Sequence, residues 1–277
     1  MEKKEHRHAA AVKIVCLCLV CALLGGAAGF FAAGADRKRL EQRLADVEAA
    51  LAAAHAGSAL SGADIYEMAC GQAVRIQTEY AVTNIFGTAI PGAASGTGFV
   101  ISDDGYVLTN YHIVEKAVQS GTDVSITLSD GSGAAACIVG CAPAQDLAVI
   151  QTDAAGLCPV ALGDSAALLV GEQVYAVGNS LGEPTLSLSG GIVSALDRVI
   201  TAAISGEQVE LQVFQMDAAV NSGSSGGPVY NDRGEVVGIV TAKYTSSGVE
   251  GLGFAIPIND AIQVAEALIR DGHNETK

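Results

Sequence analysis

The sequence contains few charged residues, and few of those are basic. Only 16% of its 277 residues are charged and 50% are hydrophobic, which excludes an acidic disordered chain. Lys and Arg number 15 against 30 Asp and Glu, so the formal net charge is −15. Because binding to phosphates needs a basic face, the composition argues against nucleic acid as a partner.

Charge is absent altogether from residues 14–35. A helix of this length spans roughly 33 Å at about 1.5 Å per residue, enough to cross the hydrocarbon core of a membrane. The small residues Ala33-Gly34-Ala35 leave a cleavable signal peptide as the alternative. The sequence therefore predicts a single-pass anchor in the cell membrane over 14–35, a cytoplasmic N-terminus over 1–13, and an extracytoplasmic domain after it.

Residues 36–62 have the pattern of a helical stalk that ends in a linker of small residues. Leu40, Leu44, Val47 and Leu51 follow the spacing of a coiled-coil seam, although the pattern covers fewer than three heptads. A solvated helical spacer explains the same pattern equally well.

Helical periodicity disappears from residue 66 until a closing helix near the C-terminus. About eleven short apolar runs, among them 106–109, 147–151 and 236–242, are separated by Gly- and Asp-rich turns. Strands without intervening helices predict an all-β domain, and these are too many for one small barrel. The predicted domain covers 66–272, with a final helix that begins near Asn259 and ends at Gly272.

Cysteine spacing gives no metal site. Three of the seven cysteines lie within 14–35, and the others are Cys70, Cys137, Cys141 and Cys158. The four domain cysteines allow three disulfide pairings, and the sequence does not choose among them. No second ligand pair accompanies Cys137 and Cys141 at metal-binding distance in the sequence, so we expect neither a metal nor another cofactor.

Three features of the domain carry residue types suited to catalysis. His112 is the only histidine inside the predicted domain, and it follows a strand where we expect a turn. Asp146 begins an apolar strand, where it could be a turn residue or the acceptor for a histidine N–H. The third feature is the Gly- and Ser-rich loop 221–228, which could expose a hydroxyl beside aligned backbone N–H groups, or could be an ordinary hairpin loop.

In the order His, Asp, Ser, these segments resemble the HtrA/Deg family of trypsin-like serine proteases. The matching blocks are SGTGFVISDDGYVLTNYHIV (95–114), QDLAVI (145–150), AVGNSLG (176–182), MDAAVNSGSSGGPVYN (216–231) and GLGFAIP (251–257). The resemblance covers roughly 70–272 and implies a chymotrypsin-like fold of two six-stranded antiparallel β-barrels with a C-terminal helix. The chain resembles a membrane-anchored form without a PDZ domain, because little sequence follows the closing helix.

The resemblance also implies a role for each matched position. Ser225 would be the nucleophile, His112 the general base and Asp146 the residue that orients the histidine. Backbone N–H groups of Gly223, Ser224 and Ser225 would form the oxyanion hole, chiefly those of Gly223 and Ser225.

The expected substrates are unfolded or misfolded exported polypeptides, cleaved in envelope protein quality control. Ala219 stands where trypsin-like enzymes that cut after Lys or Arg carry an acid, so the expected pocket accepts a small or medium aliphatic side chain. Its lining would be Ala219, Val220, Thr241 and Ala242. The alternative is a catalytically silent chaperone or binding module on the same fold. Relatives in this family often form trimers, so the resemblance also implies a possible homo-oligomer.

Overall fold

The computed structural model describes residues 59–83, 89–122, 124–179, 185–241 and 252–275, and all of these except residue 59 fall within the unit Leu60–Lys277. The predicted anchor over 14–35 and the stalk up to residue 58 lie outside the described residues. In the ranges that are described, no helix combines the length and the apolar character needed to cross a bilayer.

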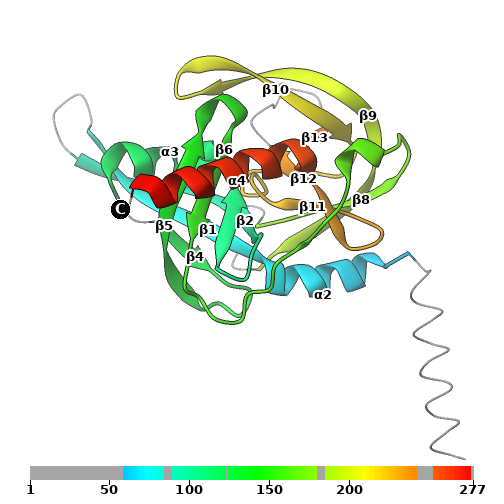
Figure 1. The fold of residues 1–277 in the computed structure, drawn as a ribbon, viewed down its shortest axis with the longest axis horizontal. Helices are drawn as coiled ribbons and strands as arrows, with labels where there is room; N and C mark the ends of the chain where they lie inside the picture. Colours follow the sequence, from blue (N-terminus) through cyan, green and yellow to red (C-terminus); the bar gives the residue numbers. More distant parts are fainter. Residues whose placement is uncertain (1–58, 84–88, 123, 180–184, 242–251, 276–277) are drawn as a thin grey trace, which may run out of the picture. The chain divides into compact units, whose positions relative to one another are not determined.

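Six antiparallel strands of the N-terminal half close into the first barrel (Figure 1). Alternation explains β1, where Val74, Ile76 and Thr78 are fully buried inside the barrel and the residues between them are more exposed. In barrel order the strands are β1 (Ala73–Thr83), β2 (Ala89–Val100), β3 (Tyr106–Thr109), β6 (Leu147–Gln151), β5 (Gly133–Ala142) and β4 (Val124–Thr127).

A second sheet follows, and pairing of its strands β11 and β12 closes six of its seven strands into another barrel. These six are β11 (Pro228–Asn231), β8 (Gln173–Gly178), β9 (Ser187–Ile204), β10 (Glu207–Met216), β13 (Gly253–Pro257) and β12 (Glu235–Thr241). The prediction of two six-stranded barrels is confirmed. The seventh strand, β7 (Ala161–Leu162), was not predicted and pairs in parallel with β12.

Helix α4 (Ile258–Glu275) is the predicted closing helix, but it continues past Gly272, where the sequence predicted its end. It contacts β5 and β6 of the first barrel and β12 and β13 of the second, and it crosses the front of the ribbon in Figure 1. Ala261 and Ala265 on its inner face are fully buried. One amphipathic helix therefore packs on both barrels.

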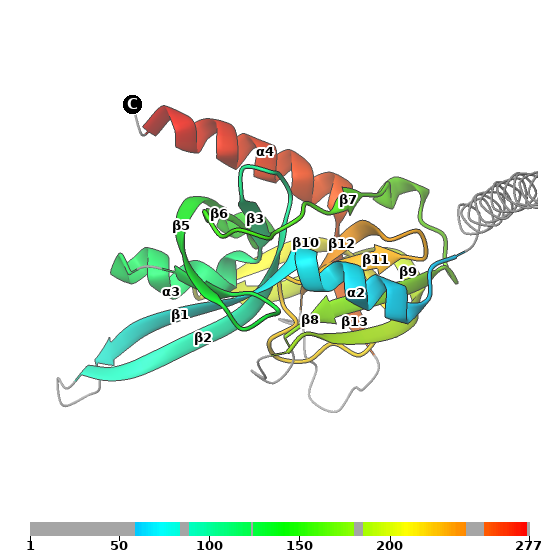
Figure 2. The same cartoon turned by 90° about the horizontal axis from the view of Figure 1, so that it is seen from below.

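The remaining helices were not expected from the sequence. Helix α2 (Gly62–Gln72) starts inside the predicted linker, and a capping box between Ser61 and Asp64 satisfies its first turn. In Figure 2 it lies toward the viewer, below α4. The other helices are α3 (Tyr111–Ser120) and the single 3₁₀ turns η1 (Pro143–Gln145) and η2 (Ser165–Ala167). The folded unit thus begins at Leu60, a few residues before the predicted start at 66.

The four domain cysteines are free thiols in this structure. Cys137 and Cys158 are exposed, and Cys70 and Cys141 are partly buried. None of the three pairings that the sequence left open is formed.

Candidate active site

Asp146 is fully buried at the point where η1 ends and β6 begins. Its backbone is left-handed (φ 54°), a conformation that Asp tolerates better than most residues. The Asp146 carbonyl accepts hydrogen bonds from the Asn110 side-chain amide at 2.9 Å and from the Tyr111 N–H at 3.1 Å. These bonds attach Asp146 to the N-terminus of α3.

His112 lies in the first turn of α3, so the expectation of a turn at this position is wrong. No side-chain cap from Asn110 satisfies the start of this helix, and Asp146 Oδ1 accepts the His112 backbone N–H at 3.0 Å instead. A carboxylate at a helix N-terminus is also favoured by the helix dipole.

The imidazole of His112 contacts the same carboxylate. His112 Nδ1 lies 2.8 Å from Asp146 Oδ2 and 3.1 Å from Oδ1, and the His112 side chain is 10% exposed. Because an ionised carboxylate can only accept, Nδ1 carries the proton and Nε2 of the neutral ring keeps its lone pair. This is the tautomer that a general base needs.

Ser225 lies in the loop between β10 and β11, and it is 5% exposed. Its carbonyl accepts the N–H of Thr97 in β2 at 2.9 Å, which attaches the loop to the first barrel. The next residue, Gly226, has φ 81°, and a Cβ there would lie 2.2 Å from Thr97 O and 3.0 Å from Asn110 N. Only glycine therefore lets this loop approach the segment that leads into His112.

Gly223 precedes Ser225 by two residues and has φ 95°. The intervening Ser224 donates its N–H to Asn221 O at 3.0 Å, which closes a tight turn. The Ser224 N–H is engaged within the loop. The expected donors of the oxyanion hole are therefore the N–H groups of Gly223 and Ser225.

Of the expected pocket residues, two precede this tight turn in the chain and one follows it at the end of β12. Ala219 is exposed and donates its N–H to Ser189 Oγ at 2.8 Å, whereas Val220 is half-buried and packs near Gly253. Thr241 at the end of β12 is 1% exposed, and its Oγ1 has no hydrogen-bond partner. Ala242 lies outside the described residues.

Sequence reasoning missed Thr97 and Asn179. The hydroxyl of Thr97 donates to Gly223 O at 2.7 Å and accepts the Asn179 N–H at 2.9 Å. Gly178 packs so closely that a Cβ there would lie 2.7 Å from Ser224 Cα. Both positions fall inside blocks that carried the family resemblance, but nothing local distinguishes them as site residues. Among the described residues, no cluster of His, Cys, Asp or Glu is arranged to hold a metal ion.

The fold and the His–Asp contact define a trypsin-like enzyme scaffold, and comparison with known proteins agrees. Residues 96–239, more than half of the chain, match the family model of the trypsin-like peptidase domain. The chain belongs to this family.

Its relatives within the family are of the HtrA type. It is 42% identical over 178 residues to a probable periplasmic serine endoprotease DegP-like of Halomonas elongata, a match over 64% of this chain and 35% of the relative. It is also 42% identical over 173 residues to the serine protease Do-like HtrB of Bacillus subtilis, over 62% of this chain and 37% of the relative. The chain thus matches about a third of the length of these curated relatives.

Two solved structures of the HtrA-type protease AlgW, each with a decapeptide, superimpose on this fold. The structure of a variant of that protease gives a TM-score of 0.68 at 29% identity and covers 77% of this chain and 68% of the other. The unmodified protease with the same kind of peptide gives a TM-score of 0.63 at 29% identity, over 77% of this chain and 69% of the other. The fold, including the two barrels, is therefore shared with HtrA-type proteases.

Proposed function

We propose that the protein is a serine endopeptidase that cleaves unfolded or misfolded exported polypeptides. The observation that carries this proposal is the 2.8 Å contact between His112 Nδ1 and Asp146 Oδ2, beside a loop that holds Ser225 against the first barrel. A serine hydroxyl is a poor nucleophile at neutral pH unless a correctly oriented base removes its proton. The Asp146 contact supplies that orientation.

The proposed reaction proceeds through an acyl-enzyme. Ser225 Oγ attacks the peptide carbonyl carbon while His112 Nε2 takes the hydroxyl proton, and Asp146 stabilises the imidazolium. The N–H groups of Gly223 and Ser225 donate to the oxyanion. His112 then protonates the leaving amine, and water hydrolyses the ester by the same route in reverse.

We assign the P1 pocket to Ala219, Val220, Thr241 and Ala242. The exposed Ala219 carries no charge, and the half-buried Val220 presents an apolar side chain near Gly253. A pocket of this kind favours a small or medium aliphatic P1 residue, which unfolded polypeptides expose and folded proteins bury.

The deciding experiment compares the full-length wild type with Ser225→Ala. Both are incubated with casein, an unfolded protein, and separately with a fluorophosphonate that acylates activated serines. We expect cleavage and labelling by the wild type alone. A folded wild type that neither cleaves nor labels would reject the protease and favour the binding module on the same fold.

We also propose that residues 14–35 tether the domain to the outer side of the cell membrane. The uncharged run supports the tether, and the printed name of the Halomonas elongata relative, which includes "periplasmic", supports the location. Alkaline carbonate extraction of cells that express the full chain should leave it in the membrane fraction, and external protease should reach the domain in spheroplasts. Release by carbonate would contradict the tether.

A homo-oligomer is a separate proposal. Light scattering of the detergent-solubilised chain would test whether it forms a trimer.

A further inference from the structure

We propose that Thr97 is a positioning residue whose hydroxyl fixes the backbone of the oxyanion hole. This inference rests on the proposed protease function and adds a residue from the first barrel to the machinery of the second. The side chain of Thr97 is completely buried in β2.

Thr97 uses every polar group it has at this point of the fold. Its N–H donates to Ser225 O at 2.9 Å, and its Oγ1 donates to Gly223 O at 2.7 Å. The same oxygen accepts the Asn179 N–H at 2.9 Å, and the Thr97 carbonyl accepts Thr109 Oγ1 at 2.7 Å. A hydroxyl that both accepts and donates cannot rotate without losing one of these bonds.

These contacts hold the catalytic loop at two carbonyl groups. Between Gly223 O and Ser225 O lies the peptide unit that carries the Ser225 N–H, so fixing both carbonyls fixes the direction of that N–H. The turn closed by Ser224 N–H on Asn221 O continues the fixed backbone toward the Gly223 N–H. Donors aimed in advance at the oxyanion avoid reorganisation during the reaction, which is the source of their catalytic effect.

The hydroxyl also connects the loop to the end of β8. Asn179 is fully buried. Thr97 Oγ1 accepts the Asn179 N–H and donates to Gly223 O, so it bridges the two backbones. A Cβ on the neighbouring Gly178 would lie 3.2 Å from Thr97 Oγ1 and 2.7 Å from Ser224 Cα, so these segments are in close contact. Valine at 97 would keep the shape and remove both side-chain bonds.

The test measures kcat and KM for a peptide substrate with full-length Thr97→Val, Thr97→Ser and Thr97→Ala. We expect Thr97→Val to lower kcat by roughly ten- to a hundredfold, less than loss of an oxyanion donor itself, with KM nearly unchanged. The pH dependence of kcat/KM should keep the wild-type shape, because His112 and Asp146 are untouched. Thr97→Ser should restore most of the activity.

Thr152→Val is the matched control, because Thr152 is a buried threonine of the first barrel whose hydroxyl donates to Ala135 O at 2.9 Å. It should keep the wild-type kcat. If Thr97→Val fails to fold, the Ser and Ala variants decide, since both lack the methyl group and differ only in the hydroxyl. Equal kcat for Ser and Ala, or wild-type kcat for a folded Val variant, would overturn the role of Thr97. An inactive wild type would instead reject the proposed protease function.

Discussion

At the scale of single residues, Asp146 has a structural role at the start of α3 and a chemical role in the proposed reaction. Its carbonyl and carboxylate satisfy the backbone at the start of α3, and the same carboxylate orients the His112 ring. The residue that we propose orients the general base therefore also positions the helix that carries it. A substitution at Asp146 must be designed to separate these roles.

Asp146→Asn is such a substitution, because the side chain keeps its shape and one carbonyl oxygen. We expect kcat to fall by about 10⁴-fold, because the amide favours the wrong imidazole tautomer, while the fold is kept. Hydrolysis of a peptide substrate and circular dichroism measure the two effects. Asp164→Asn, at a carboxylate that accepts from Ala166 and Asn259 away from the site, should leave kcat unchanged. Similar losses in the two variants would argue against a catalytic Asp146.

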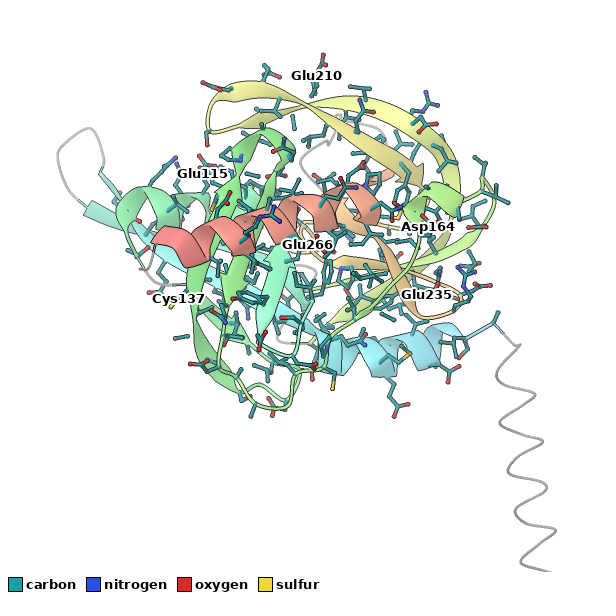
Figure 3. All side chains as sticks on the ribbon, viewed as in Figure 1. Glu115, Cys137, Asp164, Glu210, Glu235 and Glu266 are labelled. Atoms are coloured by element: carbon teal, nitrogen blue, oxygen red, sulfur yellow. The ribbon has the colours of Figure 1, made fainter. Side chains whose placement is uncertain are left out.

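Burial separates the domain thiols in their reactivity. Burial raises the pKa of Cys141 to about 11 from an ordinary value of 9.0, and this side chain packs against the core of the first barrel. The nucleophile in alkylation is the thiolate, so the raised pKa predicts that Cys141 reacts slowly near pH 8. Cys137 and Cys158 are exposed, and Figure 3 shows Cys137 at the outer side of its barrel.

We expect iodoacetamide at pH 8 to modify Cys137 and Cys158 in the folded protein and Cys141 only after denaturation, as peptide mass mapping would show.

The raised pKa of Cys141 also predicts a change of stability with pH. The folded state holds the Cys141 proton more tightly than the unfolded chain, so stability falls as pH rises from about 9 to about 11. Cys141→Ala should remove that part of the pH dependence. Rapid modification of Cys141 in the folded protein would contradict both expectations.

At the scale of elements, the loop between β10 and β11 is defined by how closely it approaches the first barrel. Gly226 combines φ 81° with a position where a Cβ would lie 2.3 Å from Thr109 Oγ1. Gly156 has nearly the same dihedral, φ 84°, but a Cβ there would meet nothing within 4 Å. The two glycines separate the cost of the dihedral from the cost of the contact.

We predict that Gly156→Ala costs about 1–2 kcal/mol of stability through its dihedral alone and leaves activity intact. Gly226→Ala should cost more than about 4 kcal/mol, or abolish activity if the loop moves away instead. Urea unfolding and peptide hydrolysis of both variants provide the comparison. If the two variants lose the same stability and both stay active, the close approach of this loop is not required.

The elements also show what the sequence could reveal. Strands such as β6 and β12, buried on both faces, are evident as apolar runs. Strand β1 was not predicted because it contains no apolar run. Arg75, Gln77 and Glu79 alternate with its buried residues directly after α2. Helix α3 escaped because its N-terminal partner, Asp146, is supplied from 34 residues away.

The residues of the proposed site also differ in whether the sequence indicates them. His112, Asp146 and Ser225 could be proposed from the sequence because their segments match family motifs. Thr97 could not, since a threonine in a strand carries no local signal and its partner Gly223 is 126 residues distant in the chain. Residues that hold a site in place act through tertiary contacts, which motif reading does not include.

At the scale of the whole molecule, each barrel supplies part of the proposed site, and the domain that contains it is acidic. His112 and Asp146 come from the first barrel and Ser225 from the second, so the proposed reaction requires both barrels to be packed. Residues 58–277 contain seven Lys and Arg against twenty-four Asp and Glu. Figure 3 shows carboxylates such as Glu210, Glu235 and Glu266 on elements of the second barrel and on α4. The excess of acidic residues predicts a negative field around the domain, which a polypeptide substrate of the proposed protease would meet as it approaches.

This field predicts a salt-dependent preference for basic substrates. A peptide with an aliphatic P1 residue and distant flanking lysines should show a higher kcat/KM at low salt than the same peptide with flanking glutamates, while kcat stays similar. Raising the ionic strength from about 0.01 M to about 1 M shortens the Debye length from about 30 Å to about 3 Å, so the two values should converge. A glutamine-flanked peptide, which carries no flanking charge, should change little with salt. A preference that persists at high salt would place the discrimination in a local contact with the lysines, because only long-range attraction is screened.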